Sequence, residues 1–116
     1  QYSVAYQDDV RGLGLPAARQ ALLLAPDDPR VLDVMGQVFW SLNDIPSAER
    51  FLQRAIEQDA AYAEAYLHLG QLFLQQQDQL QAQIFLRKAL ELGQNQPAGE
   101  IASRLLQQYF NSGGQP

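Results

Sequence analysis

The side chains best suited to chemistry are a glutamate and a histidine placed one helical turn apart. Glu64 and His68 are separated by four residues, so on a helix they lie on the same face. Carboxylate and imidazole are both zinc ligands, but a protein zinc site needs at least a third ligand. His68 is the only histidine and the chain has no cysteine. We therefore expect an ordinary helical histidine beside a glutamate, and no metal site.

Two further patterns match the residue types of ligand-binding motifs but lack the surroundings that those motifs require. Gly12-Leu13-Gly14-Leu15-Pro16-Ala17 reads G-x-G-x-x-A, but a dinucleotide site also requires a preceding strand and a βαβ unit, which the sequence does not predict. Asp8-Asp9 and Asp27-Asp28 lack the alternating ligands of a calcium loop and are interpreted as turn and cap residues. We expect no catalytic residue, no cofactor and no metal: the chain is predicted not to be an enzyme.

Composition restricts the kinds of partner. The 116 residues carry a formal net charge of −5, and Lys88 is the only lysine, which argues against nucleic acid as a partner because its binding depends on Lys and Arg. No apolar run reaches the roughly 18 residues that a membrane span needs, so no membrane insertion is expected. No feature fixes the compartment, and a cytoplasmic location is favoured. The first residue is Gln rather than Met, so we expect further sequence upstream.

Most of the stretch Val31–Ile56 recurs as Ala65–Leu90, at a spacing of 34 residues that is seen, for example, between Gly36 and Gly70. The matched pairs are Met35-Gly36 with Leu69-Gly70, Phe39 with Phe73, Ala48 with Ala82, Phe51-Leu52 with Phe85-Leu86, and Ala55-Ile56 with Ala89-Leu90. A period of this length indicates stacked structural repeats rather than one globular core.

Proline, glycine and cap residues divide the chain into helices, and no period-2 run predicts a sheet. Helices are expected at about 16–24, 30–42, 46–58, 61–76, 79–92 and 97–110. Gln1–Asp9 is interpreted as the end of an earlier helix. The predicted organisation is a single domain with a partial repeat at 1–28, repeats at 29–62 and 63–96, a capping helix at 97–110 and a flexible tail at 111–116.

The spacing of these residues resembles a known repeat family. Leu67-x-Leu69-Gly70-x-x-Phe73, followed by Ala82, Phe85-Leu86 and Ala89-Leu90, is similar to the tetratricopeptide repeat. The resemblance implies an all-α fold: a right-handed α–α superhelix of antiparallel helix pairs, A and B, with about two and a half repeats and a C-terminal closing helix. It also implies a non-catalytic scaffold that binds a peptide or helix of another protein in the concave groove lined by the A helices.

Small residues at matching positions are expected where the A and B helices approach each other. A glycine inside a helix costs roughly 0.5–1 kcal/mol relative to alanine. Gly36 and Gly70 accept this cost at the same phase and are expected to face Ala48 and Ala82. The small residues assigned to this contact are Gly36, Ala48, Ala55, Gly70, Ala82 and Ala89.

The remaining A-helix positions are expected to line the groove. These candidates are Tyr6, Arg30, Asp33, Val34, Gln37, Trp40, Glu64, Leu67, His68, Gln71, Leu74, Gln75, Ile101 and Leu105. Aligned aromatic and aliphatic residues among glutamines are typical of a peptide-binding groove. Because Gln37 and Gln71 take the central positions and no lysine lies on this face, a clamp for a terminal carboxylate is not expected. Alternatively, Trp40 packs on a neighbouring helix, and Ile101 and Leu105 cover Leu67.

Two other functions stay open at this point. The first is self-association into a homodimer or larger homo-oligomer through the end helices, which would bury their apolar faces. Its candidate contacts are Tyr2, Ala5 and Tyr6 at one end and Leu106, Tyr109 and Phe110 at the other. The second is a role as the accessory segment of a longer enzyme or sensor.

Overall fold

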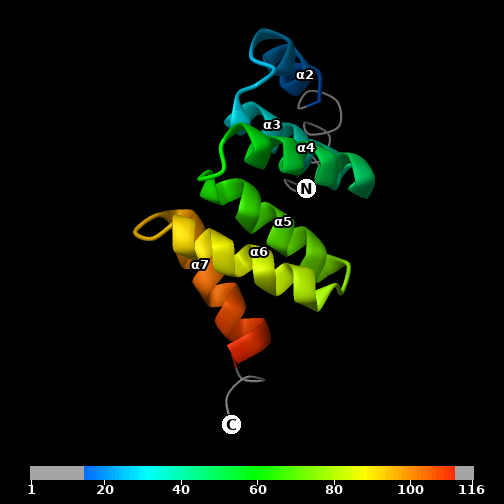
Figure 1. Cartoon of the computed structure of the whole chain (residues 1–116). Helices are drawn as coiled ribbons and strands as arrows, with labels where there is room; N and C mark the ends of the chain where they lie inside the picture. The colour runs from blue at the N-terminus through cyan, green and yellow to red at the C-terminus, as the bar shows by residue number, and fades with distance from the viewer. Residues whose placement is uncertain (1–14, 112–116) are drawn as a thin grey trace, which may run out of the picture. The chain divides into compact units, whose positions relative to one another are not determined.

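The computed structural model describes residues 15–111, which form six α-helices and a closing π-helical turn and contain no strand. The helices are α2 (Leu15–Leu24), α3 (Pro29–Ser41), α4 (Ile45–Gln58), α5 (Ala63–Gln75), α6 (Gln79–Leu92) and α7 (Pro97–Leu106), followed by η2 (Gln107–Asn111) (Figure 1). The chain divides into two compact units between Ala60 and Ala61. Unit 1 contains α2–α4, unit 2 contains α5–η2, and the all-α prediction is confirmed.

The turn from α3 to α4 closes helix α3 with a left-handed residue. Asn43 has φ 63°, its N–H donates to the Trp40 carbonyl at 2.9 Å, and the Asp44 N–H donates to the Phe39 carbonyl at 2.8 Å. This pair of bonds satisfies two carbonyls that the helix end would otherwise leave free, as in the Schellman motif. Asp44 then begins α4, because its Oδ1 accepts a hydrogen bond from the Ser47 N–H at 3.3 Å.

The same turn is built again in unit 2, at positions 34 residues later. Gln77 has φ 63°, its N–H donates to the Leu74 carbonyl at 3.0 Å, and the Asp78 N–H donates to the Phe73 carbonyl at 2.9 Å. Asp78 Oδ1 accepts from the Gln81 N–H at 3.2 Å and caps α6. The repeat in the sequence is therefore a repeat of backbone geometry as well as of apolar positions.

The core of unit 1 joins α2, α3 and α4. Ala18, Met35 and Val38 are buried together, with half-buried apolar side chains around them. Phe39 of α3 stacks on Phe51 of α4, with ring centroids 5.5 Å apart. Full burial of a side chain such as Met35 or Val38 stabilises a fold by about 1.5–3 kcal/mol. The surrounding side chains are Leu22, Phe39, Leu42 and Phe51.

The core of unit 2 is an interlocked pair, α5 and α6, against which α7 packs. Leu69 and Leu72 of α5 and Leu86 of α6 are fully buried. Phe85 of α6 lies between two rings of α5, with centroid distances of 5.5 Å to Phe73 and 6.2 Å to Tyr66. The helical hairpin is thus held by an apolar and aromatic contact that runs along both helices.

The expected helices agree with the structure to within about two residues at most ends. The largest difference is at the C-terminal end, where α7 stops at Leu106 and the predicted helix continues as the π-helical turn η2. The expected stub at Gln1–Asp9, the glycines of the G-x-G stretch and the tail beyond residue 111 lie outside the described residues. The right-handed superhelix stays a prediction. No helix in residues 15–111 is long and apolar enough to cross a membrane.

Candidate partner-binding surface

In each complete repeat, a glycine of the A helix (α3 or α5) faces a leucine of the B helix (α4 or α6), which lets the two helices pack closely. A Cβ built on Gly36 lies 2.7 Å from Leu52 Cγ, and one built on Gly70 lies 2.6 Å from Leu86 Cδ2. Sequence reasoning paired these glycines with Ala48 and Ala82; the structure places the Ala48 carbonyl oxygen near Gly36 as a third neighbour, at 3.2 Å, and leucine first in both units. The predicted alanines Ala48, Ala55, Ala82 and Ala89 are all fully buried.

In unit 2, two further glycines, Gly93 and Gly99, bring the backbones of α6 and α7 into contact. The sequence predicted a break between these helices but not this contact. Gly93 caps α6 and Gly99 lies in the first turn of α7, and the two backbones touch. A Cβ on Gly93 would lie 2.7 Å from the Gly99 nitrogen, and a Cβ on Gly99 would overlap the Gly93 carbonyl. A signal for it was present, because a glycine inside a helix is unfavourable unless contact requires it.

In unit 1, the predicted lining residues of α3 divide into exposed and buried ones. Arg30, Gln37 and Val34 are exposed, the last to 46% of its surface, and Trp40 is half-buried. Asp33 was predicted to line the groove, but it is 3% exposed and its Oδ2 accepts a hydrogen bond from Gln37 Nε2 at 3.1 Å. A buried carboxylate needs such partners, so Asp33 is not open to another protein.

In unit 2, the same division holds on α5. Gln75 is exposed, and the half-buried residues of the predicted face are Glu64, His68, Gln71 and Leu74. Leu67 was also predicted to line the groove, but it is 3% exposed and belongs to the buried residues of α5. The alternative interpretation, in which Leu67 is covered by a neighbouring helix, agrees with this burial, whereas helix phase alone does not say which element covers a position.

Helix α7 adds an apolar edge to this face of unit 2. It packs against α5, and Ile101 and Leu105 are half-buried. In the 34-residue register these two residues are the counterparts of Leu67 and Gln71. Leu74 of α5 and Ile101 and Leu105 of α7 are thus partly exposed apolar residues on two helices that pack together, and Gln71 and Gln75 of α5 add amide side chains.

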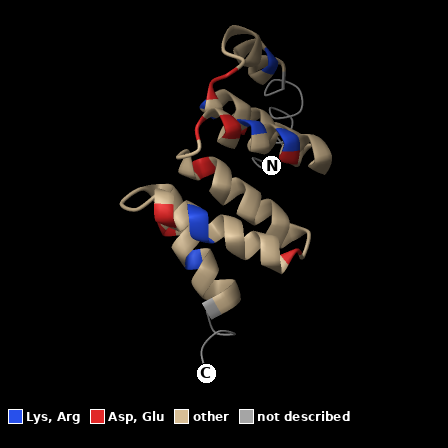
Figure 2. Ribbon diagram, viewed as in Figure 1, with Lys and Arg blue, Asp and Glu red and all other residues tan. Residues whose placement is uncertain are grey.

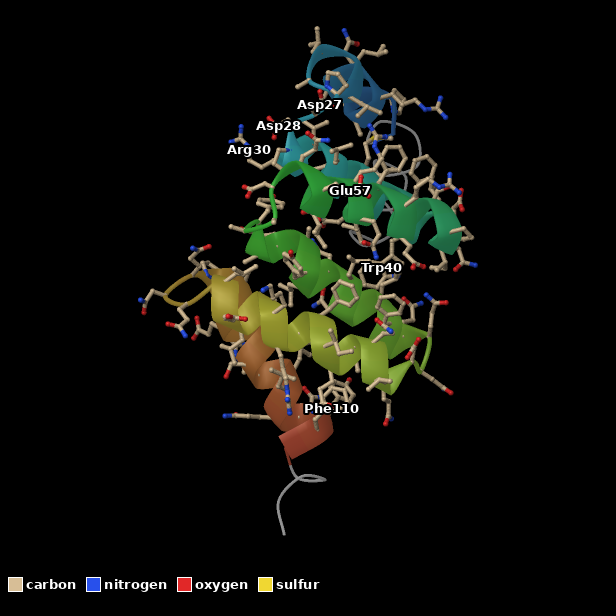
Figure 3. The ribbon with its side chains drawn as sticks, viewed as in Figure 1. Asp27, Asp28, Arg30, Trp40, Glu57 and Phe110 are labelled. Atoms are coloured by element: carbon tan, nitrogen blue, oxygen red, sulfur yellow. The ribbon has the colours of Figure 1, made fainter. Side chains whose placement is uncertain are left out.

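The clearest electrostatic feature lies at the start of α3. Asp28 Oδ1 accepts from the Arg30 N–H at 2.9 Å, and Arg30 Nη2 lies 3.2 Å from Asp28 Oδ2, as the labelled side chains show (Figure 3). The Arg30 side-chain hydrogen bond, followed by that of the Arg30 amide, lowers the pKa of Asp28 below its ordinary value of 3.8. Arg30 was predicted to contact a partner; its guanidinium is held locally but stays largely exposed, at 77% of its side chain.

The remaining candidates add little chemistry. Tyr6 lies outside the described residues. Within residues 15–111, no three His, Asp or Glu side chains gather where they would hold a metal ion. Most of the described residues are uncharged, and the charged ones form short segments (Figure 2).

Comparison with known proteins agrees with this repeat architecture. The family model for the tetratricopeptide repeat matches residues 63–95, which covers α5, α6 and the start of the turn to α7. No curated protein matches the chain.

Proposed function

We propose, from the match of residues 63–95 to the tetratricopeptide repeat, that the chain is a non-catalytic scaffold that binds a peptide or helix of another protein along its A helices. Repeats of this family generally mediate protein–protein interaction and are typically not catalytic. The proposed surfaces are the exposed side of α3 in unit 1 and the shared face of α5 and α7 in unit 2. Neither nucleic acid nor a membrane is the proposed partner.

The observation that carries the proposal is the composition of the α5–α7 face. Leu74, Ile101 and Leu105 are left partly exposed, whereas Leu69, Leu72 and Leu86 of the same unit are fully buried. Gln71 and Gln75 supply amide donors and acceptors beside them. A partner segment would bury the apolar groups and satisfy its own backbone by bonding to these amides, which is the usual combination in helix-in-groove recognition.

In unit 1, Trp40 and Val34 are the corresponding apolar candidates on α3. Trp40 is half-buried, so part of its ring packs within the protein and part is open. Tryptophan is among the residues that most often dominate binding energy at interfaces. Trp40 thus takes part in packing as well as in the proposed contact, and its replacement requires a check of folding.

The test begins with a partner obtained by affinity capture and then measured with purified components. Leu74→Ala and Trp40→Ala, each confirmed as folded by circular dichroism, are expected to lower the affinity for the partner by about tenfold, or 1.4 kcal/mol. Leu80→Ala is the matched control, because Leu80 is 69% exposed on the B helix α6. Equal affinities for the wild type, Leu74→Ala and Trp40→Ala would remove the A-helix face from the function.

Self-association is the second candidate, favoured by the apolar residues near the C-terminal end of unit 2. Tyr109 is 54% exposed, and Leu106 and Phe110 are half-buried. A second copy that covers them would bury this surface, and Tyr109→Ser would then shift the equilibrium to monomer. Sedimentation velocity over a hundredfold range of concentration separates the two ideas, because a strict monomer eliminates the dimer. The counterparts predicted at the other end, Tyr2 and Ala5, lie outside the described residues.

A further inference from the structure

A separate hollow of about 410 Å³ opens over the B helix α6 of unit 2. Its walls are mainly apolar, with the ring of Phe85 beside the buried Tyr66 and with Ile84, which is 51% exposed. Charged side chains stand at its edge. The lining residues are Tyr66, Ile84, Phe85, Arg87, Lys88 and Glu91.

The equivalent place in unit 1 is occupied by the protein itself. Phe51 is the counterpart of Phe85 in the 34-residue register, and the Arg54 guanidinium lies over its ring at 5.3 Å from the centroid. The counterpart of Arg54 in unit 2 is Lys88, which instead forms an ion pair with Glu91, with Lys88 Nζ 3.8 Å from Glu91 Oε1.

A second substitution between the repeats makes the place in unit 2 more apolar. Arg50 in unit 1 is replaced by Ile84 in unit 2. The two changes, Arg50 to Ile84 and Arg54 to Lys88, turn an aromatic ring covered by a cation into part of the wall of an apolar hollow. The hollow in unit 2 is therefore lined by residues that differ in kind from their counterparts in unit 1.

The charges at the edge decide what kind of group fits. Arg87 and Lys88 are cations and Glu91 is an anion, so the edge carries one net positive charge although the whole chain carries −5. Figure 2 shows this pair of neighbouring cations as the broad blue band on α6. Glu91 is already paired with Lys88, while Arg87 is exposed and forms no ion pair with any residue in the range 15–111. A second cation would be repelled here, whereas a carboxylate would be attracted.

We propose that this hollow on α6 binds a protein segment that carries an apolar side chain next to a carboxylate, the side chain lying against Phe85 and the carboxylate meeting Arg87. The occupant is a partner segment in which an acidic residue stands beside an aromatic or aliphatic residue. This surface lies on a B helix and is distinct from the A-helix face of the proposed function.

The test uses a matched pair of small probes on the full chain. N-acetyl-phenylalanine carries the apolar ring and the carboxylate, and its amide carries the ring alone. In ¹H–¹⁵N spectra, the carboxylate probe is expected to shift the amides of Ile84, Phe85 and Lys88 in a saturable way. Its Kd is expected to be about threefold lower than that of the amide probe, the size of one exposed ion pair.

Three variants separate the contributions. Arg87→Gln is expected to give both probes the same Kd, and Ile84→Arg, which restores the unit 1 residue, is expected to weaken both at least fivefold. Arg104→Gln is the matched control, because Arg104 is an exposed cation on α7 paired with Glu100 at 3.8 Å. It should change neither Kd.

Three outcomes overturn the proposal: absence of saturable shifts at α6, shifts that map to another helix, or equal Kd values for the two probes on the wild type. None of them affects the A-helix face, whose test measures Leu74 and Trp40 with a protein partner. The reverse also holds, so the failure of either proposal is distinguishable from the failure of the other.

Discussion

Leu86 fills the space that a side chain on Gly70 would need. A Cβ on Gly70 would lie 2.6 Å from Leu86 Cδ2 and 2.7 Å from Leu86 Cγ, and Leu86 is fully buried. The same relationship joins Gly36 to Leu52 in unit 1, at 2.7 Å and 2.9 Å. In each helical hairpin, a leucine of the B helix therefore packs directly on the backbone of the A helix at its glycine.

Gly70→Ala is expected to destabilise unit 2 by up to about 2 kcal/mol, because overpacking costs about 1–3 kcal/mol and alanine regains only about 1 kcal/mol in a helix. In a Leu86→Ala background the two side-chain contacts are gone and the backbone nitrogen of position 86, at 3.3 Å, is the close neighbour that stays, so the same change should stabilise by about 0.5–1 kcal/mol. Urea unfolding followed by circular dichroism measures all four proteins of the cycle.

Fluorescence of Trp40, the only tryptophan, provides the control, because it reports on unit 1. If Gly70→Ala had the same effect with and without the Leu86 side chain, the glycine would not be explained by this contact.

Gln77 takes a left-handed conformation that its side chain makes unfavourable. It has φ 63° in the turn between α5 and α6, where Asn43 stands in the equivalent turn of unit 1. Gln77→Gly is expected to stabilise by about 0.5–1 kcal/mol, and Gln77→Asn by less, because glycine has no Cβ and asparagine tolerates this region. Thermal unfolding should give the highest melting temperature for Gln77→Gly, a lower one for Gln77→Asn and the lowest for the wild type. Asn43→Gly is the matched control and should change the melting temperature less.

The number and type of elements were predictable because the relevant signals are local. Pro29 and Pro46 open helices within their first turns, and Asp44 and Asp78 cap the helices that follow them. The 34-residue register then carried the assignment from one hairpin to the next. These signals depend on residues within one or two turns of each other, so no knowledge of distant contacts was required.

The exposure of single positions was less predictable, because it depends on contacts that helix phase does not encode. Asp33 and Leu67 were placed on an open face by phase, yet both are 3% exposed. The Gly93–Gly99 contact is between backbones and follows no periodic pattern. The hollow over Phe85 was also missed, although the replacement of Arg50 by Ile84 between the repeats was visible in the sequence.

Asp28 makes the start of α3 sensitive to acid. Its pKa is lowered by hydrogen bonds from Arg30, first from the side chain and then from the amide. Because the folded-state pKa is the lower one, the stabilisation is fully present above the ordinary value of 3.8 and is lost as the pH falls through the folded-state pKa. Titration of the Asp28 carboxyl carbon by NMR should give a midpoint below 3.8.

Asp28→Asn is the informative variant, because asparagine still caps a helix but carries no charge. Its unfolding free energy should fall less than that of the wild type between pH 5 and pH 2, a range chosen to span the pKa of roughly 4 of a free aspartate. In Arg30→Gln, the Asp28 pKa should move up towards 3.8. An unchanged midpoint in that variant would show that Arg30 does not set the pKa.

Gly99→Ala is expected to be the most damaging of these changes, because the group it meets cannot move aside. Its new methyl would overlap the Gly93 carbonyl, whose oxygen already accepts a hydrogen bond from the Gln96 N–H at 2.9 Å. Gly70 meets a side chain, which can change rotamer, whereas Gly93 presents backbone that this bond fixes. We expect the free energy of unfolding to fall by about 3 kcal/mol, or α7 to be displaced from α6.

The control is Glu100→Ala, at an exposed position of the same helix turn, whose free energy of unfolding should stay within about 0.5 kcal/mol of the wild type. Hydrogen exchange of the α7 amides distinguishes the two results: displacement opens α7 while α5 and α6 stay protected, and equal protection in Gly99→Ala and Glu100→Ala would contradict the contact.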